Sequence, residues 1–599
     1  MTADFYENEK LEGAEEQISY REAFAKLIPY LKEHTKGLII CLILLTGGTL
    51  LSLYWPKLLR DALDINLAEN DVKGLIYTVI AIGLIQLTTI IVQYIMRIKL
   101  EIIGQDVMLS LKRRVFHHIL SLDVSYFDKN PVGRLMARVE SDAEALRMMF
   151  TNTIVLIVGD IILITGIYSL LFYFNWKLAS ILFINVPIIA VMVYIFHKKT
   201  TPKFYEVRRK MAEVTALLAE FLHGMSIVQI FHSGAYARKR VDDANKSKFD
   251  DDAYVNIAVI LFFNSVFFFE YVKIGLILIL GPIFGISFGT IVMFIIYVWR
   301  SFEPIWRTSE QLSTFQKAIA GSKRIFALLS EEPRITEPEN AVQWDGLNES
   351  VEFENVTFSY TDDDNYVLKN VSFKIEKGKR VALVGVTGGG KSTVISLLLR
   401  YYDPQQGRVL IDGKDIRTIP TFEFRSKFAL VLQDIVLFPG NIETNVSLES
   451  EKVTTEEVRN ACETVKADTF ISKLKEQYAT EVSEKGSNFS RGERQLLSFA
   501  RALVVNPDLL ILDEATSSVD PETERMIQES LTKLMEGRTS LIIAHRLSTI
   551  LDADEILVLK QGEIIERGTH LELIQQNGYY SDLFHLQFKN NNGELADAV

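Results

Sequence analysis

The sequence of 599 residues has little cysteine, no excess of positive charge and no recognisable leader pattern. Its two cysteines are Cys41, in an apolar run, and Cys462, in a polar region, so a disulfide is not expected and the soluble part is predicted to be cytosolic. The net charge of −12 argues against nucleic acid as the main partner. The opening stretch MTADFYENEKLEGAEEQISY lacks a basic segment followed by an apolar core, so no cleavable signal is expected.

Hydrophobic residues, by contrast, make up 48% of the chain, and the mean hydropathy of +0.15 indicates a mixture of membrane and soluble parts. The first half contains long apolar runs, each reaching the ~20 residues that a helix needs to cross a bilayer. Buried helices of a soluble protein are the alternative, which six runs of this length disfavour. The runs are approximately 37–59, 74–96, 152–174, 177–197, 254–280 and 283–305.

Connectors between these runs alternate in length and charge. Two of them are about 55 residues long and rich in Lys and Arg, whereas the first short connector carries Asp61, Asp64, Glu69 and Asp71. The positive-inside rule therefore places the long connectors and both termini in the cytoplasm. Their helical periodicity predicts that membrane helices continue into the cytoplasm. Residues 18–37 are amphipathic and predict a helix along the inner membrane surface, with an ordinary cytosolic helix as the alternative.

The composition changes after residue 330. A polar, proline-bearing linker, EEPRITEPENAVQWDGLNES, precedes short β-branched runs such as RVALVGV, LLILDEA and TSLIIAH, several of them separated by helical patterns. This alternation predicts an α/β nucleotide-binding domain with a mostly parallel core sheet.

A glycine-rich loop follows the strand RVALV and precedes the helical VISLLLRYY. Its sequence GVTGGGKST matches G-x-x-x-x-G-K-[ST] in the required strand–loop–helix context, which predicts that its backbone N–H groups cradle phosphate oxygens. Lys391 is expected to reach the β- and γ-phosphates of a nucleotide, and the Ser392 hydroxyl is expected to bind Mg²⁺. The predicted ATP-binding residues of this loop are Gly385, Val386, Thr387, Gly388, Gly389, Gly390, Lys391, Ser392 and Thr393.

Two further strands end in residues suited to phosphate chemistry. LLILDEA ends in Asp513, predicted to hold Mg²⁺ directly or through water, and in Glu514, predicted to activate the attacking water as a general base. LIIAHRLST places His545 after a strand, where it is predicted to bond the γ-phosphate or orient the water. Solvated surface acids and a structural histidine are the alternatives.

This ordered set of motifs resembles the ABC exporter half-transporters, in which six membrane helices are fused to one nucleotide-binding domain. The resemblance covers about residues 20–585. It implies that Tyr360 stacks on adenine, that Gln433 senses Mg²⁺ and takes part in catalysis, that Glu484 touches the coupling loops, and that Asp520 ends a loop between two nucleotide domains. Residues 121–147 and 220–234 are similar to the two cytoplasmic coupling loops of these exporters.

The signature turn of this family, usually LSGGQ, reads FSRGE here. Ser490 and Gly492 are retained, whereas Arg491 and Glu493 depart from the pattern. Glu493 favours the helix dipole but brings negative charge toward ATP, and Arg491 offsets it. In this family the turn serves the ATP of the opposite subunit, so the departure bears on the partner's site.

The resemblance further implies an ATP hydrolase that uses ATP and Mg²⁺. It implies a homodimer or a heterodimer, with the heterodimer slightly favoured, in the lipid bilayer of the cell membrane. The exported molecules are expected to be hydrophobic or amphipathic drugs, lipids or peptides. A channel or regulatory subunit gated by ATP is the alternative. The fold expected is a six-helix all-α membrane domain with cytoplasmic extensions plus an α/β P-loop domain with a helical subdomain. The expected boundaries are 1–36 for the tail and surface helix, 37–325 for the membrane domain, 326–350 for the linker, 351–587 for the nucleotide domain and 588–599 for the tail.

Polar residues inside the apolar runs are the candidates for a substrate cavity, because ionisable groups are costly at membrane depth. They are Asp160, Asn264 and Glu270, and two carboxylates favour cationic amphiphiles. In the alternative, Glu270 and Lys273 neutralise each other three residues apart on one helix.

Overall fold

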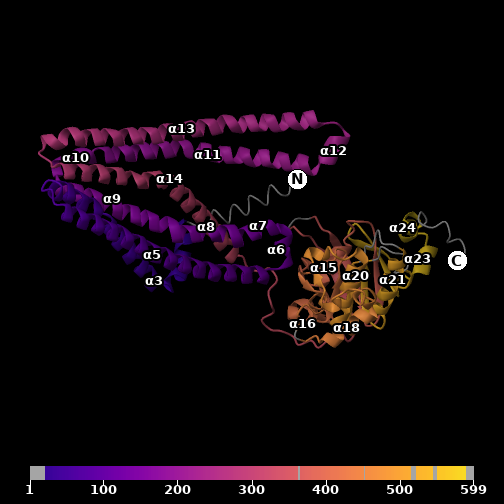
Figure 1. The fold of residues 1–599 in the computed structure, drawn as a ribbon. Coiled ribbons are helices and arrows are strands. Elements are labelled where there is room, and N and C mark those ends of the chain that lie inside the picture. Colours follow the sequence, from indigo (N-terminus) through magenta and orange to yellow (C-terminus); the bar gives the residue numbers. More distant parts are fainter. Residues whose placement is uncertain (1–19, 362–364, 451, 514–520, 544–549, 589–599) are drawn as a thin grey trace. The chain divides into compact units, whose positions relative to one another are not determined.

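The computed structural model describes residues 20–361, 365–450, 452–513, 521–543 and 550–588. The described chain forms two compact units. The first holds the residues up to Leu120 together with Val132–Glu331, and the second holds Ser121–Pro131 together with the residues from Glu332 onward. Each unit has its own hydrophobic core. Figure 1 shows the long helices of the first unit and the mixed helices and strands of the second.

The first unit is all-helical. Its helices are α2 (Tyr20–Lys32), α3 (Thr35–Ser52), α4 (Trp55–Asp61), α5 (Val72–Ser121), α7 (Val132–Ala137), α8 (Ala143–Met148), α9 (Ile154–Phe174), α10 (Trp176–Phe183), α11 (Asn185–His223), α12 (Met225–Ile230), α13 (Gly234–Ile283) and α14 (Phe288–Leu329). The π-helical segments Arg138–Asp142 and Met149–Thr153 join neighbouring α-helices without a loop, and a third, Ala62–Asn66, extends α4 up to the turn before α5. The predicted surface helix at 18–37 corresponds to α2 and the start of α3.

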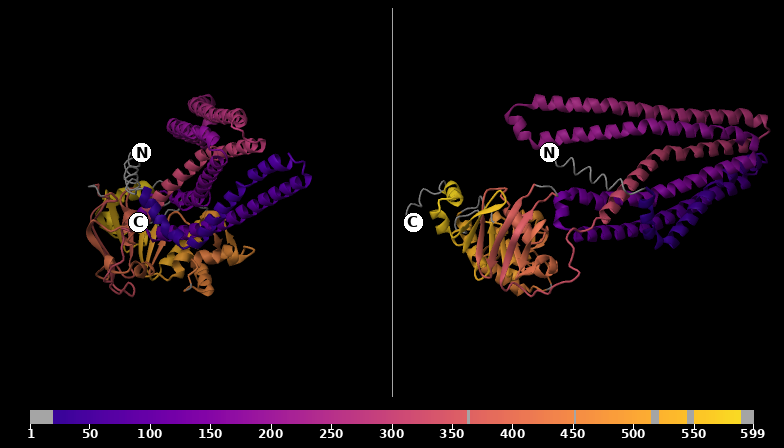
Figure 2. Two further views of the ribbon diagram at one scale, coloured as in Figure 1. Left: turned by 90° about the vertical axis from the view of Figure 1, so that its left-hand side faces the viewer. Right: turned by 180° about the vertical axis from the view of Figure 1, so that it is seen from behind.

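Long helices dominate this unit, as the sequence predicts. Both α5 and α13 have 50 residues, which makes each about 75 Å long at ~1.5 Å per residue, more than twice the ~30 Å of hydrocarbon in a bilayer. Helices α11 and α13 run side by side along their length and are joined by the short α12 (Figures 1 and 2). The membrane helices therefore continue as helices beyond the apolar runs.

Five helical segments among the described residues are long and apolar enough to cross a membrane: Thr35–Asn66, Val72–Ser121, Val132–Phe174, Trp176–His223 and Gly234–Ile283. They contain the first five predicted runs. The sixth run, 283–305, begins at the last residue of α13 and continues into α14, which carries Arg300 and Glu303 within this stretch. Arg300 is bound within the unit, because its guanidinium donates to the carbonyl oxygen of Ser52 at 2.6 Å and to the Ser52 hydroxyl at 3.1 Å.

The second unit is an α/β domain. Its strands are β1 (Ser350–Phe358), β2 (Leu368–Glu376), β3 (Arg380–Val384), β4 (Gln406–Ile411), β5 (Lys414–Asp415), β6 (Phe428–Val431), β7 (Gly440–Asn441), β8 (Glu481–Val482), β9 (Leu509–Asp513), β10 (Thr539–Ile543), β11 (Glu555–Lys560) and β12 (Glu563–Gly568). Its helices are α6 (Val124–Lys129), α15 (Lys391–Leu398), α16 (Thr421–Arg425), α17 (Ile442–Ser447), α18 (Thr455–Thr464), α19 (Asp468–Ile471), α20 (Arg491–Val504), α21 (Pro521–Met535), α23 (His570–Gln575) and α24 (Tyr579–Phe588).

The core sheet of this unit has the strand order β12-β11-β3-β10-β9-β6. Strands β11, β3, β10, β9 and β6 are mutually parallel, and only β12 pairs antiparallel, so the predicted mostly parallel sheet is confirmed. A second sheet, β2-β1-β4-β5, is antiparallel. Parallel strands put their carboxyl ends on one edge, so the loops after β3, β9 and β6 open on the same side.

A buried ion pair lies inside the first unit. The Lys273 ammonium donates to Glu270 Oε1 at 2.7 Å, and both residues are 1% exposed. The second carboxylate oxygen of Glu270 has no hydrogen-bond partner within the described part of the chain. The ion pair lowers the free-energy cost of burying these two charges within the membrane segment, where a single unpaired charge would be strongly unfavourable.

We predict that Lys273→Met destabilises the protein by about 3–5 kcal/mol, because it leaves a buried carboxylate unpaired. The double variant Glu270→Gln/Lys273→Met is expected to recover most of this loss, measured by thermal unfolding of the detergent-solubilised protein. Lys248→Met is the matched control on the same helix, since Lys248 faces Asp252 at 3.5 Å in a partly exposed pair worth at most ~1 kcal/mol. Equal effects of Lys273→Met and Lys248→Met would contradict the account.

Candidate functional site

The glycine-rich loop joins β3 to α15 at the open edge of the core sheet. Gly388 and Gly390 have φ angles of +83° and +101°, in the left-handed region that side chains disfavour. A Cβ on Gly385 would lie 2.2 Å from the carbonyl oxygen of Leu559 on β11. The backbone conformation thus favours glycine at two positions and the close approach of β11 favours it at the third. The loop is therefore free of side chains at these positions and lies at a helix N-terminus, which suits a phosphate chain.

Lys391 lies beneath this loop. It is 6% exposed, and its ammonium donates to the carbonyl oxygens of Gly385 and Val386 at 2.8 and 3.0 Å. Burial lowers the pKa of the Lys391 ammonium, and the negative charge of Asp513 opposes that shift. The lysine and the carboxylate at the end of β9 therefore act on each other across the sheet edge.

Tyr360 lies beside the loop in a small cluster of aromatic side chains. Its hydroxyl and that of Thr393 are 3.1 Å apart, within hydrogen-bonding distance, and its ring meets the Tyr402 ring edge to face, with centroids 5.0 Å apart. Tyr360 is 37% exposed, so the phenol end is fixed while part of the ring stays accessible. Sequence reasoning missed Tyr402, although its position just after the helix that follows the glycine loop, next to Tyr401, was a usable signal.

Gln433 and Asp513 line one small cavity, together with Arg491 and Gln495 at the start of α20. Gln433 follows β6 and Asp513 ends β9, and these two strands are adjacent and parallel. The pairing of neighbouring strands thus brings together two residues 80 positions apart in sequence. The other predicted catalytic and dimer-contact residues, Glu514, Asp520 and His545, lie outside the described residues.

The signature turn forms a reciprocal helix cap. Ser490 is the N-cap of α20, and its hydroxyl oxygen accepts the backbone N–H of Glu493 at 3.3 Å. The Glu493 carboxylate in turn accepts the backbone N–H of Ser490 at 2.7 Å. This S-x-x-E capping box gives Glu493 a local structural role that sequence reasoning reduced to a favourable dipole contact. Gly492 is buried, Arg491 and Glu493 are half-buried, and Ser490 is exposed.

Helix α6, from the first predicted coupling loop, belongs to the same compact unit as the nucleotide domain. At its start, Asp123 caps the helix by accepting Tyr126 N–H at 3.1 Å and also accepts the backbone N–H of Arg334 at 2.6 Å. Near its end, Asp128 accepts the Tyr402 hydroxyl at 2.5 Å. Burial and this hydrogen bond raise the pKa of the Tyr402 phenol, which keeps it a donor. Both ends of α6 are therefore tied to this unit.

Glu484, the other predicted coupling residue, lies exposed in a short 3₁₀ turn, Glu484–Gly486. The turn contains two left-handed residues, Lys485 at φ +56° and Gly486 at φ +66°. The sharp reversal presents the carboxylate at the surface of the unit just ahead of the signature turn, which fits a contact with another segment better than a packing role.

The predicted substrate-cavity residues do not gather at one place. Asp160 on α9 accepts the Arg307 guanidinium at 2.8 Å and the Gln311 amide at 3.2 Å, both from α14. Asp160 and Gln311 line a cavity of about 410 Å³ whose other walls are mostly apolar. Glu270 is held by Lys273, as the alternative interpretation proposed. Asn264 is exposed, and its amide donates to the carbonyl oxygen of Ile260 one turn earlier.

Comparisons with known proteins agree with this geometry. Residues 38–300 match the family of ABC transporter transmembrane regions, and residues 368–517 match the ABC transporter family. A probable multidrug resistance ABC transporter ATP-binding/permease protein of Bacillus subtilis is 36% identical over 528 residues, covering 87% of this chain and 78% of that protein. An ATP-dependent lipid A-core flippase of Syntrophus aciditrophicus is 34% identical over 575 residues, covering 95% of each.

A solved structure of a bacterial Atm1-family ABC exporter with ATP bound is similar over 93% of this chain and 98% of that one, with a TM-score of 0.73 and 27% identity. These matches span both units. The chain belongs to the ABC transporter family and is an exporter-type half-transporter, an integral membrane protein that binds ATP and couples ATP hydrolysis to transport.

We predict that Glu493→Gln, which restores the usual residue of the signature turn, changes stability by less than ~0.5 kcal/mol and leaves ATPase activity unaltered, because glutamine also completes the capping box. Glu493→Ala removes the cap and is expected to cost about 0.5–2 kcal/mol of stability. Thermal unfolding and steady-state ATPase assays on the same preparations measure both effects. A large rise in ATPase activity for Glu493→Gln would show instead that the carboxylate acts on ATP.

Proposed function

We propose that this half-transporter pairs with a second one and uses Mg²⁺ and ATP to move hydrophobic or amphipathic molecules out of the cytoplasmic side of the cell membrane. The observation that supports the proposal best is the convergence of Lys391, Asp513 and Gln433 at the open edge of one parallel sheet. The orientation, with both termini and the nucleotide domain in the cytoplasm, rests on the basic long connectors.

Within the ATP site, each side chain has a role that its position supports. The glycine loop and Lys391 hold the phosphates, Tyr360 offers its partly exposed ring to adenine, and Glu514 serves as the general base. His545 bonds the γ-phosphate or orients the water, and Asp520 belongs to the contact between two nucleotide domains. Glu484 and α6 carry the conformational signal toward the membrane domain.

A magnesium site fits the donor set at the sheet edge. Asp513 contributes a carboxylate, Ser392 a hydroxyl and Gln433 an amide oxygen, which are the hard oxygen ligands that this ion takes alongside water and phosphate. Among the described residues, no three or more His, Cys, Asp and Glu side chains gather where they could hold a metal ion. The proposed site therefore combines a few protein oxygens with water and phosphate oxygens. When bound, the ion offsets the negative charge of the phosphates, while the chain's own residues orient the nucleotide and the water.

The partner completes the site through its signature turn. In this chain the Ser490 oxygen accepts the Glu493 N–H, an arrangement that leaves the hydroxyl hydrogen to donate to a phosphate on the opposite subunit. The Glu493 carboxylate is turned back onto the Ser490 backbone, which moderates its repulsion of ATP. A turn of this form could contact the ATP of the opposite subunit in a homodimer as well as in a heterodimer. The altered turn sequence slightly favours the heterodimer.

For the substrate, the cavity beside Asp160 is the main candidate. Its volume of about 410 Å³ falls within the range of small-molecule sites, and its walls combine apolar side chains with one polar cluster. Because Arg307 already pairs with Asp160, a strong preference for cations is not expected. Related proteins named as multidrug resistance transporters and lipid A-core flippases support drugs and lipids as the substrate classes.

We predict that Glu514→Gln lowers ATP turnover by about 10²–10⁴-fold, the usual contribution of a general base, while ATP binding is retained. Single-turnover hydrolysis and nucleotide binding on the purified transporter measure the two effects separately. Glu524→Gln, a change of the same chemistry on α21 ten residues further along the chain, is the control. Unchanged turnover in Glu514→Gln would overturn the assignment.

We predict that Tyr402→Phe, which removes the hydroxyl donated to Asp128 but keeps the ring beside Tyr360, leaves the KM for ATP unchanged. The same variant is expected to weaken the stimulation of ATPase activity by transported compounds, because α6 loses the hydrogen bond at one of its two ends. Tyr402→Ala also removes the ring and is expected to raise the KM as well. ATPase titrations with and without Hoechst 33342 make the comparison, and identical profiles for both variants would refute the distinction.

A further inference from the structure

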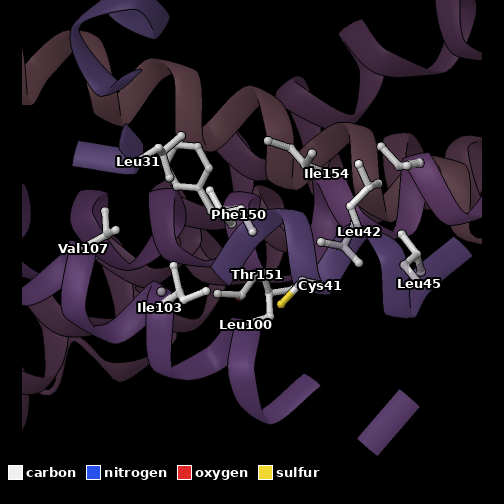
Figure 3. Close-up of a pocket in the computed structure, with 14 residues that line it drawn as sticks. Leu31, Cys41, Leu42, Leu45, Leu100, Ile103, Val107, Phe150, Thr151 and Ile154 are labelled. Atoms are coloured by element: carbon white, nitrogen blue, oxygen red, sulfur yellow. The ribbon is translucent and has the colours of Figure 1, made fainter. Parts of the chain in front are cut away.

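A second cavity, of about 350 Å³, lies beneath α2 where α3, α5 and the start of α9 meet (Figure 3). It shares no lining residue with the cavity beside Asp160. Leu31 from α2 lines it together with Leu42, Ile103 and Phe150 from three other parts of the unit. The proposed function gives this cavity no role.

The lining is hydrocarbon apart from two side chains, and both of these are already bonded. The Thr151 hydroxyl donates to the carbonyl oxygen of Arg147 at 3.0 Å, and the Cys41 thiol contacts the carbonyl oxygen of Met96 at 3.9 Å. Because the Thr151 hydroxyl hydrogen is already donated, its oxygen remains only as an acceptor, and most polar groups of a ligand would lose their hydration without compensation. The cavity therefore suits an aliphatic chain.

The position of the cavity along the helices places it at one face of the membrane. Its α3 residues, Leu38 to Leu45, open a span that begins at Thr35. Its α5 residues, Leu100 to Val107, come directly after the apolar run 74–96. The lining thus lies at the boundary between hydrocarbon and headgroups, on the side that the connector charges assign to the cytoplasm.

Positive charge borders this boundary. Lys32 and Lys36 flank the residues that α2 and α3 give to the cavity, Arg97 and Lys99 precede those of α5, and all four are exposed. Lys99 directly precedes Leu100, a lining residue, so its charge is carried on α5 at the edge of the cavity. Three acids oppose them: Glu33 and Asp106 are exposed, and Glu101 is already paired with Arg147.

We propose that this cavity binds one acyl chain of an anionic phospholipid from the cytoplasmic leaflet, with the lipid phosphate held by Lys36 and Lys99. The hydrocarbon lining selects the chain, and the cationic border selects the headgroup. Leu31 closes the cavity from α2, so the bound lipid fixes this surface helix against the membrane helices. This assignment does not depend on which molecule the transporter exports.

Photo-crosslinking tests the proposal on the full-length transporter in nanodiscs. Phosphatidylglycerol with a diazirine in its acyl chain is incorporated into the nanodiscs, and the sample is irradiated. The labelled peptides are then located by mass spectrometry. The label is expected to concentrate on the α3 and α5 peptides that line the cavity. Leu42→Trp, which fills the cavity, is expected to reduce this label severalfold, whereas Leu84→Trp, at a 59% exposed position of α5 outside the cavity, is expected to leave it unchanged.

A charge-reversal variant distinguishes the contribution of the lipid headgroup from that of the acyl chain. Lys36→Glu/Lys99→Glu is expected to reduce cavity labelling by phosphatidylglycerol but not by phosphatidylcholine with the same chain, and Lys73→Glu, at the opposite end of α5, serves as its control. Retained ATPase activity shows that the variants are folded. Label spread evenly over all apolar helices would overturn the proposal, as would equal labelling by both lipids or a cross-link that joins the cavity peptides to a second copy of the chain.

Discussion

The structure depends on one constraint: a backbone in hydrocarbon must satisfy all its hydrogen bonds internally. The chain meets it with helices, and because α5 and α13 continue for 50 residues each, the helical repeat also carries the backbone far beyond the bilayer. No flexible joint is needed between the part of such a helix that lies in the bilayer and the part that lies outside it. A movement at one end of α5 or α13 is therefore transmitted along a continuous helix to its other end.

A second consequence of the same constraint is the treatment of charge within the bundle. Asp160, Glu270 and Arg300 each lie in or next to an apolar run, and each is bonded: Asp160 to Arg307 and Gln311, Glu270 to Lys273, Arg300 to Ser52. The contacts of Asp160 and Arg300 connect α9 to α14 and α3 to α14, whereas the Glu270–Lys273 pair lies within α13. Among these three residues, Asp160 lines a cavity of about 410 Å³ in the described part of the chain.

Sequence reasoning succeeded where the pattern is local. The glycine loop, the strand that ends in Asp513 and the length of the helices follow from spacing and periodicity, and the Glu270–Lys273 pair was a stated alternative because its members are three residues apart. It failed where contacts join distant segments. Nothing in the sequence links Asp128 to Tyr402, or Asp160 to Arg307, since these pairs are 274 and 147 residues apart. The capping role of Glu493 is a different case: the S-x-x-E pattern is local and visible in the sequence, but the sequence reasoning covered only the departure from the family's usual turn and the helix dipole.

The central claim is that the ATP site of this chain is completed by the signature turn of a second chain. Mixed-subunit complementation tests it most directly: Lys391→Ala disables the glycine loop and Ser490→Arg disables the signature turn. If the chain forms homodimers, a dimer of one of each has one intact composite site, so co-expression is expected to restore ATPase activity to well above the sum of the separate variants. In a heterodimer, the same two changes are distributed between this chain and the corresponding positions of its partner. No recovery in dimers of normal stability would contradict the account.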